Sequence, residues 1–240
     1  MIIKTTYDDL DYHLRQFDKI YRSTEMMIEW LETGGGYLKA DKVQNICDMA
    51  CGCGANLAYL AGKYPNSNFV GIELEPKLVS EGEKKLHNRN SKIIQGDWFN
   101  LDEKLKNQFD GIISFQTLSW LPNYETSLEC LARLNPTWIA VSSLFYEGDV
   151  DYFIKVNDYT ENEFLHKEMQ YNIYSLVRVK KKFEQMGYKT FKYIPYDIDI
   201  DIAPPKKKGR GTYTRKMADG KRIQISGGMM MPWYFVVASK

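Results

Sequence analysis

Apolar residues recur along the chain in two different periods, which predict where helices and strands lie. In residues 6–31 they recur at helical spacing, so we predict a helix there. The Ser-Thr-Glu sequence at 23–25 favours a second helical start within this segment. Three glycines at 34–36 then end the unit. The first part of the chain is therefore predicted to be helical.

Beyond residue 42, strand-like and helix-like patterns alternate. Short apolar runs predict five strands, at residues 43–49, 68–74, 92–97, 109–115 and 137–145. Helical patterns predict helices at residues 56–64, 77–87 and 125–134. Strands that alternate with helices pack as a parallel sheet covered on both faces, so the predicted fold class is α/β and doubly wound.

The last third of the chain follows a different pattern. Residues 146–171 have no clear period, and we predict a loop with short helices there. A helix is predicted at 173–186, followed by strands at 189–198 and 232–239. Between these two strands, the Ala-Asp-Gly sequence at 218–220 is typical of a β-hairpin turn.

Composition narrows the class of protein. The 240 residues are 44% hydrophobic and 26% charged, as in an ordinary globular domain. Lys and Arg total 32 against 31 Asp and Glu, and this balance argues against a protein that coats nucleic acid. No apolar run reaches the roughly 18 residues of a membrane span, and the first residues lack an apolar signal core. We therefore expect a cytoplasmic protein without membrane contact.

The four cysteines give no sign of a metal site. Cys47, Cys51 and Cys53 have a spacing unlike that of a zinc knuckle, and no histidine lies near them in the sequence. They follow an apolar run, where cysteine behaves as a small apolar residue. We expect no bound metal.

The strongest chemical motif is the strand, turn and helix of residues 46–61. Asp48 ends the strand, and Gly52 and Gly54 allow the backbone to pass close to a ligand. The amides at the start of the helix would face an anionic group. Dinucleotide-binding folds use such a turn too, but their fingerprint would place Leu57 where a small residue belongs.

Two further carboxylates end the next two predicted strands. Glu73 ends the second strand, where a carboxylate can accept hydrogen bonds from both hydroxyls of a ribose. Asp97 ends the third strand and could accept a hydrogen bond from an adenine amine, with Trp98 beside the ring. Three acidic residues at three strand ends together outline an adenosine ligand.

These motifs resemble those of the class I S-adenosylmethionine-dependent methyltransferases of the small-molecule type. The family's first motif, acidic-x-Gly-x-Gly-x-Gly, is matched from Asp48 to Gly54, with Ala50 in place of the first glycine. The resemblance covers residues 43–144 and the two terminal strands. It implies three αβα layers, a seven-stranded, mostly parallel sheet with an antiparallel last strand, and an inserted β-hairpin.

The resemblance also implies an organisation and a cofactor. Residues 1–240 would form one domain, with a helical cap at 1–36, a cofactor-binding core at 43–145, and acceptor-side insertions at 146–172 and 199–231. The cofactor would be S-adenosylmethionine. The residues implied to contact it are Asp48, Ala50, Cys51, Gly52, Gly54, Asn56, Glu73, Leu74, Asp97, Trp98 and Gln116. Trp98 equally fits a core position, and Gln116 a strand cap.

The acceptor is less defined by the sequence. A hydroxyl acceptor usually needs a general base, for which His13, His166 and Glu147 are candidates, each open to a purely structural role. Residues that could line the acceptor site are Tyr21, Trp120, Tyr146, Arg210, Tyr213 and Arg215. The fourth strand lacks the Asn/Asp-Pro-Pro-aromatic turn of family members that act on DNA bases, which disfavours nucleic acid as the acceptor.

One segment is strongly basic. Residues 206–222 hold eight basic residues and one acidic residue. They fit either a solvated hairpin or a lid that binds an anionic acceptor. We therefore predict methyl transfer to an oxygen of a small anionic acceptor, such as a nucleotide-linked or phosphorylated sugar of surface-glycan synthesis.

Three other functions stay open at this point. The first is a nucleic-acid or protein methyltransferase that docks through the basic segment. The second is a non-catalytic scaffold that binds S-adenosylmethionine. A nicotinamide-dependent dehydrogenase is the least favoured. The sequence gives no prediction of the oligomeric state.

Overall fold

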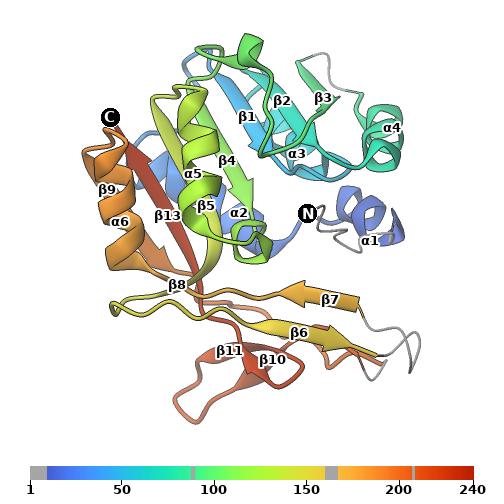
Figure 1. The fold of residues 1–240 in the computed structure, drawn as a ribbon. Helices are drawn as coiled ribbons and strands as arrows, with labels where there is room; N and C mark the ends of the chain where they lie inside the picture. Colours follow the sequence, from blue (N-terminus) through green and yellow to red (C-terminus); the bar gives the residue numbers. More distant parts are fainter. Residues whose placement is uncertain (1–9, 88–89, 160–166, 207–208) are drawn as a thin grey trace.

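The structure, a computed structural model, describes residues 10–87, 90–159, 167–206 and 209–240 (Figure 1). Its centre is a sheet whose strands follow the order β3-β2-β1-β4-β5-β13-β9, with the short β8 beside the end of β5. The strands are β1 (Asn45–Met49), β2 (Asn68–Glu73), β3 (Ser91–Gln95), β4 (Gly111–Phe115), β5 (Trp138–Tyr146), β8 (Tyr174–Ser175), β9 (Thr190–Pro195) and β13 (Trp233–Ser239).

The direction of these strands confirms the predicted sheet. Strands β1 to β5 are parallel to one another, whereas β13 is antiparallel to both β5 and β9. Asp48 lies opposite Gly71 on β2 and opposite Ile113 on β4. From β1 and β4 the chain order runs outward in opposite directions. Open α/β sheets bind their ligands at such a switch point, beyond the carboxyl ends of the strands.

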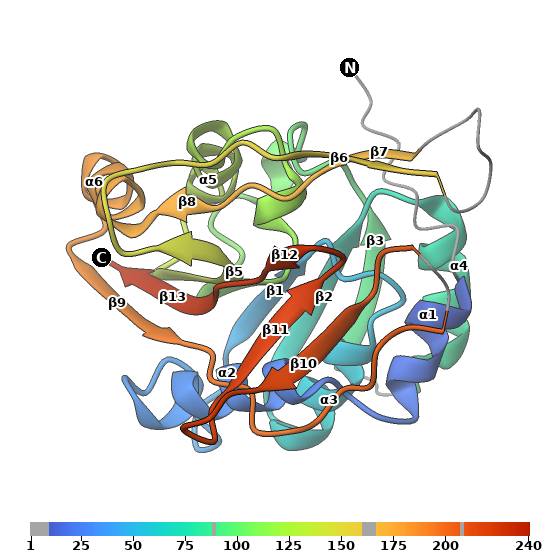
Figure 2. The same ribbon diagram turned by 90° about the horizontal axis from the view of Figure 1, so that it is seen from below.

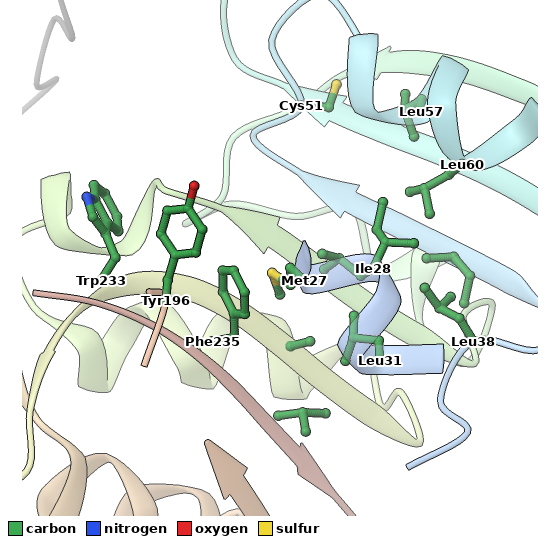
Figure 3. Packing of buried hydrophobic residues seen from close by; sticks show 14 of the residues in the cluster. Met27, Ile28, Leu31, Leu38, Cys51, Leu57, Leu60, Tyr196, Trp233 and Phe235 are labelled. Atoms are coloured by element: carbon green, nitrogen blue, oxygen red, sulfur yellow. The ribbon is translucent and has the colours of Figure 1, made fainter. Parts of the chain in front are cut away.

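Helices cover both faces of the sheet and form three layers. One face packs against α2 (Arg22–Thr33), α3 (Ala55–Lys63) and α4 (Pro76–Lys85), and the other against α5 (Tyr124–Arg133) and α6 (Leu176–Gln185). Side chains alternate along β5, so that Ala140 joins the first apolar cluster and Val141 the second. Figure 3 shows part of the first cluster, in which Ile28 of α2 packs beside Leu60 of α3.

The N-terminal segment is not the single helix that the pattern predicts. It forms α1 (Leu10–Leu14) and the 3₁₀ turn η1 (Arg15–Phe17), and α2 starts separately at Arg22. Met27, Ile28 and Leu31 of α2 are fully buried, whereas α1 and η1 contain no buried residue. The apolar positions of the two parts therefore pack against different surfaces, which the period alone does not reveal.

The segment predicted as a loop with short helices is extended instead. Within its described residues, β6 (Lys155–Asp158) pairs antiparallel with β7 (Lys167–Gln170), and no helix occurs. Exposure alternates along β6, which is the strand period that the prediction missed. The helix predicted from residue 173 starts only at Leu176, because Ser175 caps it by accepting the amide of Arg178.

The predicted hairpin is confirmed. Strands β10 (Thr212–Lys216) and β11 (Arg222–Ser226) are antiparallel, and β12 (Met229–Met230) extends them. Gly220 in the turn has φ +87°. Both hairpins lie below the carboxyl ends of the parallel strands, and Figure 2 shows β10 and β11 crossing in front of β1 and β2. In the part of the chain that the structure describes, no helix has the length and apolar character to cross a membrane.

Candidate functional site

A strained turn leads from β1 into α3. Gly52 and Gly54 have φ of +58° and +81°, and Ala50 also has a positive φ of +60°. A Cβ on Gly52 would lie 2.5 Å from Nδ1 of His13, which therefore rests directly on the turn. Glycine at position 52 is required both by its backbone angle and by this contact.

Asp48 carries a buried carboxylate. The residue is 1% exposed, and neither of its oxygens has a hydrogen-bond partner among the described residues. Burial, and then the nearby charge of Glu73, raises the pKa of Asp48 well above its usual range. Leaving an acidic group in this state is costly unless a ligand pairs with it.

Glu73 lies beside the same turn. Its two oxygens accept the amides of Gly52 at 2.9 Å and of Glu75 at 3.0 Å. Burial raises the pKa of Glu73, and these amide bonds oppose the rise. Among the described residues, neither Glu73 nor Asp48 forms an ion pair. Two carboxylates without a matching cation favour a positively charged ligand and would repel a pyrophosphate.

Of the two residues after β3 that were expected to contact the cofactor, only Asp97 is exposed; Trp98 is buried. Asp97 is exposed and accepts the amide of Phe99 at 2.9 Å, and Leu74, which follows β2, is 48% exposed. Trp98 instead belongs to the apolar cluster under α5, where its indole donates to the Ser127 carbonyl at 2.8 Å. The expected contact of Trp98 with an adenine ring is therefore corrected, because the chain turns its side chain into the core.

The start of α2 contacts the middle of the carboxyl edge, which is the edge of the sheet formed by the carboxyl ends of the parallel strands. Gln116, which follows β4 with a φ of +56°, donates from Nε2 to Ser23 Oγ at 3.3 Å. Asn56 at the start of α3 accepts from Thr24 Oγ1 at 3.1 Å. Gln116 and Asn56, both expected near the cofactor, are thus held at the edge by α2.

The cysteines of the turn are buried thiols. Cys51 donates its backbone amide to the carbonyl of Ile72 at 3.2 Å. Burial is the main cause that raises the pKa of Cys51 well above its usual range and that of Cys53 to about 11. Both side chains therefore stay protonated at neutral pH. In the described residues, no group of three or more metal-ligating side chains occurs.

An aromatic cluster lies at the other half of the carboxyl edge, beyond the end of β4. It starts at the 3₁₀ turn η3 (Leu118–Trp120), where the rings of Trp120 and Tyr171 lie 4.6 Å apart. The Arg210 guanidinium lies 5.4 Å from the Trp120 ring centre and donates to the Tyr171 hydroxyl at 3.1 Å. It also forms an ion pair with Asp158 at 3.4 Å. Arg210 therefore joins the two hairpins.

Asn172 fixes the first hairpin to the sheet. Its Nδ2 donates to the carbonyl of Leu121 at 2.9 Å, and its Oδ1 accepts the amide of Ile154 at 3.2 Å. The side chain is 1% exposed. Sequence reasoning missed Asn172, Tyr171 and Asp158, because nothing in the sequence links them to the fourth strand.

The basic segment is less cationic than its sequence suggests. Arg222 pairs with Asp201 at 2.7 Å, and Arg210 pairs with Asp158. Arg215 is exposed and has no ion pair with any described residue, while Tyr213 is half-buried opposite Ile225. Part of the positive charge of this segment is therefore neutralised within the chain, and Arg215 on the hairpin stays exposed.

The two base candidates that the structure describes, His13 and Glu147, lie near the ends of different strands, β1 and β5. His13 of α1 lies at the glycine turn. Tyr21 packs near α1, with its ring centre 6.0 Å from that of Tyr12. Tyr146 is 47% exposed and packs 6.3 Å from Tyr152.

Glu147 and His166 are the other two base candidates. Glu147 is exposed and, after burial, is the next cause that raises the pKa of Tyr234 on the α6 side of the sheet. His166 lies outside the described residues.

A hollow of about 470 Å³ opens between residues 16–20 and α3. It is lined by Gln16, Phe17, Asp18, Lys19, Ile20, Glu25, Ala55, Ala58 and Tyr59. None of the residues expected to contact a cofactor lies in it, so we place the candidate site at the strand ends and not in this hollow.

The sheet order, the reversed β13 and the glycine turn define a class I, Rossmann-like methyltransferase. More particularly, residues 46–136 match the family model described as a methyltransferase domain.

Two similar proteins match part of the chain. It is 28% identical over 150 residues to the uncharacterized protein RP028 of Rickettsia prowazekii (strain Madrid E), covering 58% of this chain and 57% of that protein. It is 27% identical over 97 residues to a trans-aconitate 2-methyltransferase of Shigella flexneri serotype 5b (strain 8401), covering 40% and 37%. The chain thus spans 57% or less of the length of these two relatives.

A solved structure shares the fold. The N-terminal domain of EvdMO1 with SAH bound superposes with a TM-score of 0.56 at 13% identity, covering 90% of this chain and 81% of that one. This likeness is one of fold.

Proposed function

We propose that the chain transfers the methyl group of S-adenosylmethionine to an oxygen of a small acceptor that carries an anionic group, such as a nucleotide-linked or phosphorylated sugar. The observation that carries the cofactor assignment is the pair of carboxylates at Asp48 and Glu73, which no described cation matches. S-adenosylmethionine has a sulfonium and an ammonium group, and its net charge is positive. A nicotinamide dinucleotide is negative at its pyrophosphate, which Asp48 would repel.

Different residues of the carboxyl edge would contact different parts of S-adenosylmethionine. Glu73 would accept the ribose hydroxyls, and Asp97 would accept the adenine amine, as the family resemblance implies. The glycine turn would lie along the methionine part, beside Asp48. S-adenosylmethionine, when bound, supplies a methyl group on a positively charged sulfur.

Positioning is the chain's main contribution to the transfer itself. Methyl transfer is an in-line displacement, so holding the acceptor oxygen in line supplies much of the rate. Gln116 and Trp120 follow β4 at the half of the edge that would hold the acceptor. The exposed cations of the β10–β11 hairpin, including Arg215, support an anionic acceptor. A relative named for trans-aconitate, itself an anion, supports the same acceptor class.

Thermal unfolding with S-adenosylhomocysteine, and with NAD in parallel, tests the cofactor assignment. A ligand at 100 times its dissociation constant should add about 2.7 kcal/mol to the free energy of unfolding. Glu73→Ala should remove most of this gain. Glu75→Ala is the matched control, because it deletes an exposed carboxylate two residues further along and should leave the gain in place. Stabilisation by NAD alone would refute the proposal.

A further inference from the structure

The buried side chains of Trp98 and Trp233 differ in the hydrogen bonding of the indole N–H. Trp98 is 6% exposed, and its indole N–H donates to the Ser127 carbonyl. Trp233 is 7% exposed, yet its indole nitrogen finds no hydrogen-bond partner among the described residues. An indole N–H can only donate, and a buried donor without an acceptor is rare in folded proteins. Trp233 therefore presents an unused donor.

The position of Trp233 is at the acceptor half of the edge. It begins β13, which runs opposite to β5, so it lies at the carboxyl ends of the parallel strands, opposite Leu144. Its carbonyl accepts the amide of Tyr196 at 2.8 Å, which sets the two residues side by side. In Figure 3 the rings of Trp233 and Tyr196 project in the same direction.

Tyr196 offers a second donor beside the first. Its ring is 8% exposed and stacks on Phe235, with 5.3 Å between ring centres. Its hydroxyl forms no hydrogen bond with any residue that the structure describes. Burial raises the pKa of Tyr196 to about 12, so the hydroxyl keeps its proton at neutral pH.

The charges around Tyr196 are negative in sum. Asp199, Arg22 and Glu25 all act on the Tyr196 hydroxyl. Arg22 is held by Asp199 at 2.8 Å and by Glu25 at 3.3 Å, so the three side chains together carry one negative charge. Such surroundings oppose a phosphate dianion, whereas they accept an uncharged oxygen.

We propose that Trp233 and Tyr196 form the inner wall of the acceptor site and donate hydrogen bonds to an uncharged carbonyl or hydroxyl oxygen on a flat acceptor. This inference rests on the proposed function and divides its acceptor into two parts. The flat, uncharged part lies against the two rings. The anionic group lies outward, toward the exposed cations of the β10–β11 hairpin.

Three small benzene derivatives test whether Trp233 and Tyr196 bind an uncharged oxygen. Benzamide, benzoate and phenyl phosphate differ in charge at the same position, and each is titrated into the full chain saturated with S-adenosylhomocysteine. The chain has five tryptophans, so ¹H–¹⁵N spectra show few indole signals, and Trp233→Phe assigns the relevant one. We expect benzamide to move the Trp233 indole proton downfield, with a dissociation constant at least tenfold below that of phenyl phosphate. The Trp98 signal should stay in place.

Tyr196→Phe keeps the ring on Phe235 and deletes only the hydroxyl, so it also serves if Trp233→Phe does not fold. It should weaken benzamide binding at least threefold and leave the affinity for S-adenosylhomocysteine unchanged. Tightest binding of phenyl phosphate would overturn the uncharged class, and no response of Trp233 to any probe would overturn the wall. Failure to bind S-adenosylhomocysteine in the first place would count against the proposed function instead.

Discussion

The two halves of the carboxyl edge hold their charges in opposite ways. At the ends of β1 and β2, Asp48 and Glu73 are acidic, close together and without a described cation. At the other half, Arg210 pairs with Asp158, and Arg22 pairs with Asp199. The first half thus has charge left for a ligand, whereas the second uses its charge to hold the chain together. Loss of a charged side chain in the first half should lower the affinity for the cofactor, and loss of one in the second half should lower the free energy of unfolding.

The largest effect is expected from Asp48→Asn. The affinity for S-adenosylmethionine should fall by about 2–3 kcal/mol, because a hydrogen bond to a charged group is lost. The free energy of unfolding without ligand should rise by about 1–3 kcal/mol, because a buried, unpaired charge is removed. Calorimetric titration and urea unfolding measure the two changes. A variant that lost affinity together with stability would show damage to the fold instead.

The same carboxylate sharpens the comparison through pH. The pKa of Asp48 is raised in the folded chain, so folding binds an extra proton there. The stability that this extra proton contributes is fully present below the pKa that Asp48 has in the unfolded chain. It is lost as the pH rises through the pKa that Asp48 has in the folded chain. The free energy of unfolding of the ligand-free chain should therefore increase as the pH is lowered toward the ordinary pKa of an aspartate. Asp48→Asn should flatten this slope, and Glu73, whose pKa is also raised, contributes to what remains.

The two halves also differ in how far the sequence predicts them. The cofactor half comes from one stretch, in which each carboxylate lies at or just beyond the end of a strand and the glycines mark the turn. Local patterns therefore place Asp48, Glu73 and Asp97 at one edge, as the structure has them. Trp98 was misplaced, because the direction of a single side chain after a strand depends on the helix it meets.

The acceptor half is assembled from segments far apart in the sequence. Trp233 and Tyr196 become neighbours only through the antiparallel pairing of β13 with β9. Asp158 reaches Arg210 only because both hairpins fold below the sheet. Neither the pairing register nor the ion pairs can be deduced from periodicity, so the basic segment looked freer than it is.

A smaller effect tests the acceptor half directly. In a double-mutant cycle, Arg210→Ala and Asp158→Ala should show a coupling of about 1–2 kcal/mol in the free energy of unfolding, because both side chains are less than a quarter exposed. The affinity for S-adenosylhomocysteine should not change. The pair Arg222 and Asp201, in which the aspartate side chain is 73% exposed, serves as the control and should show a smaller coupling. Equal coupling in both pairs would contradict a special role for Arg210 in joining the hairpins.

The smallest effect is expected at Ala50, the one departure from the family's glycine pattern. Its φ of +60° is in the left-handed region, which costs an alanine roughly 1 kcal/mol relative to glycine. Ala50→Gly should therefore relieve strain, and the gain is reduced because glycine loses more conformational freedom on folding. We expect the free energy of unfolding to rise by up to about 0.5 kcal/mol in urea. Ala55→Gly, in the first turn of α3, is the matched control and should lower it. A loss of stability at both positions would mean that the turn does not hold Ala50 in a strained conformation, and that the glycine pattern there serves only the approach of a ligand.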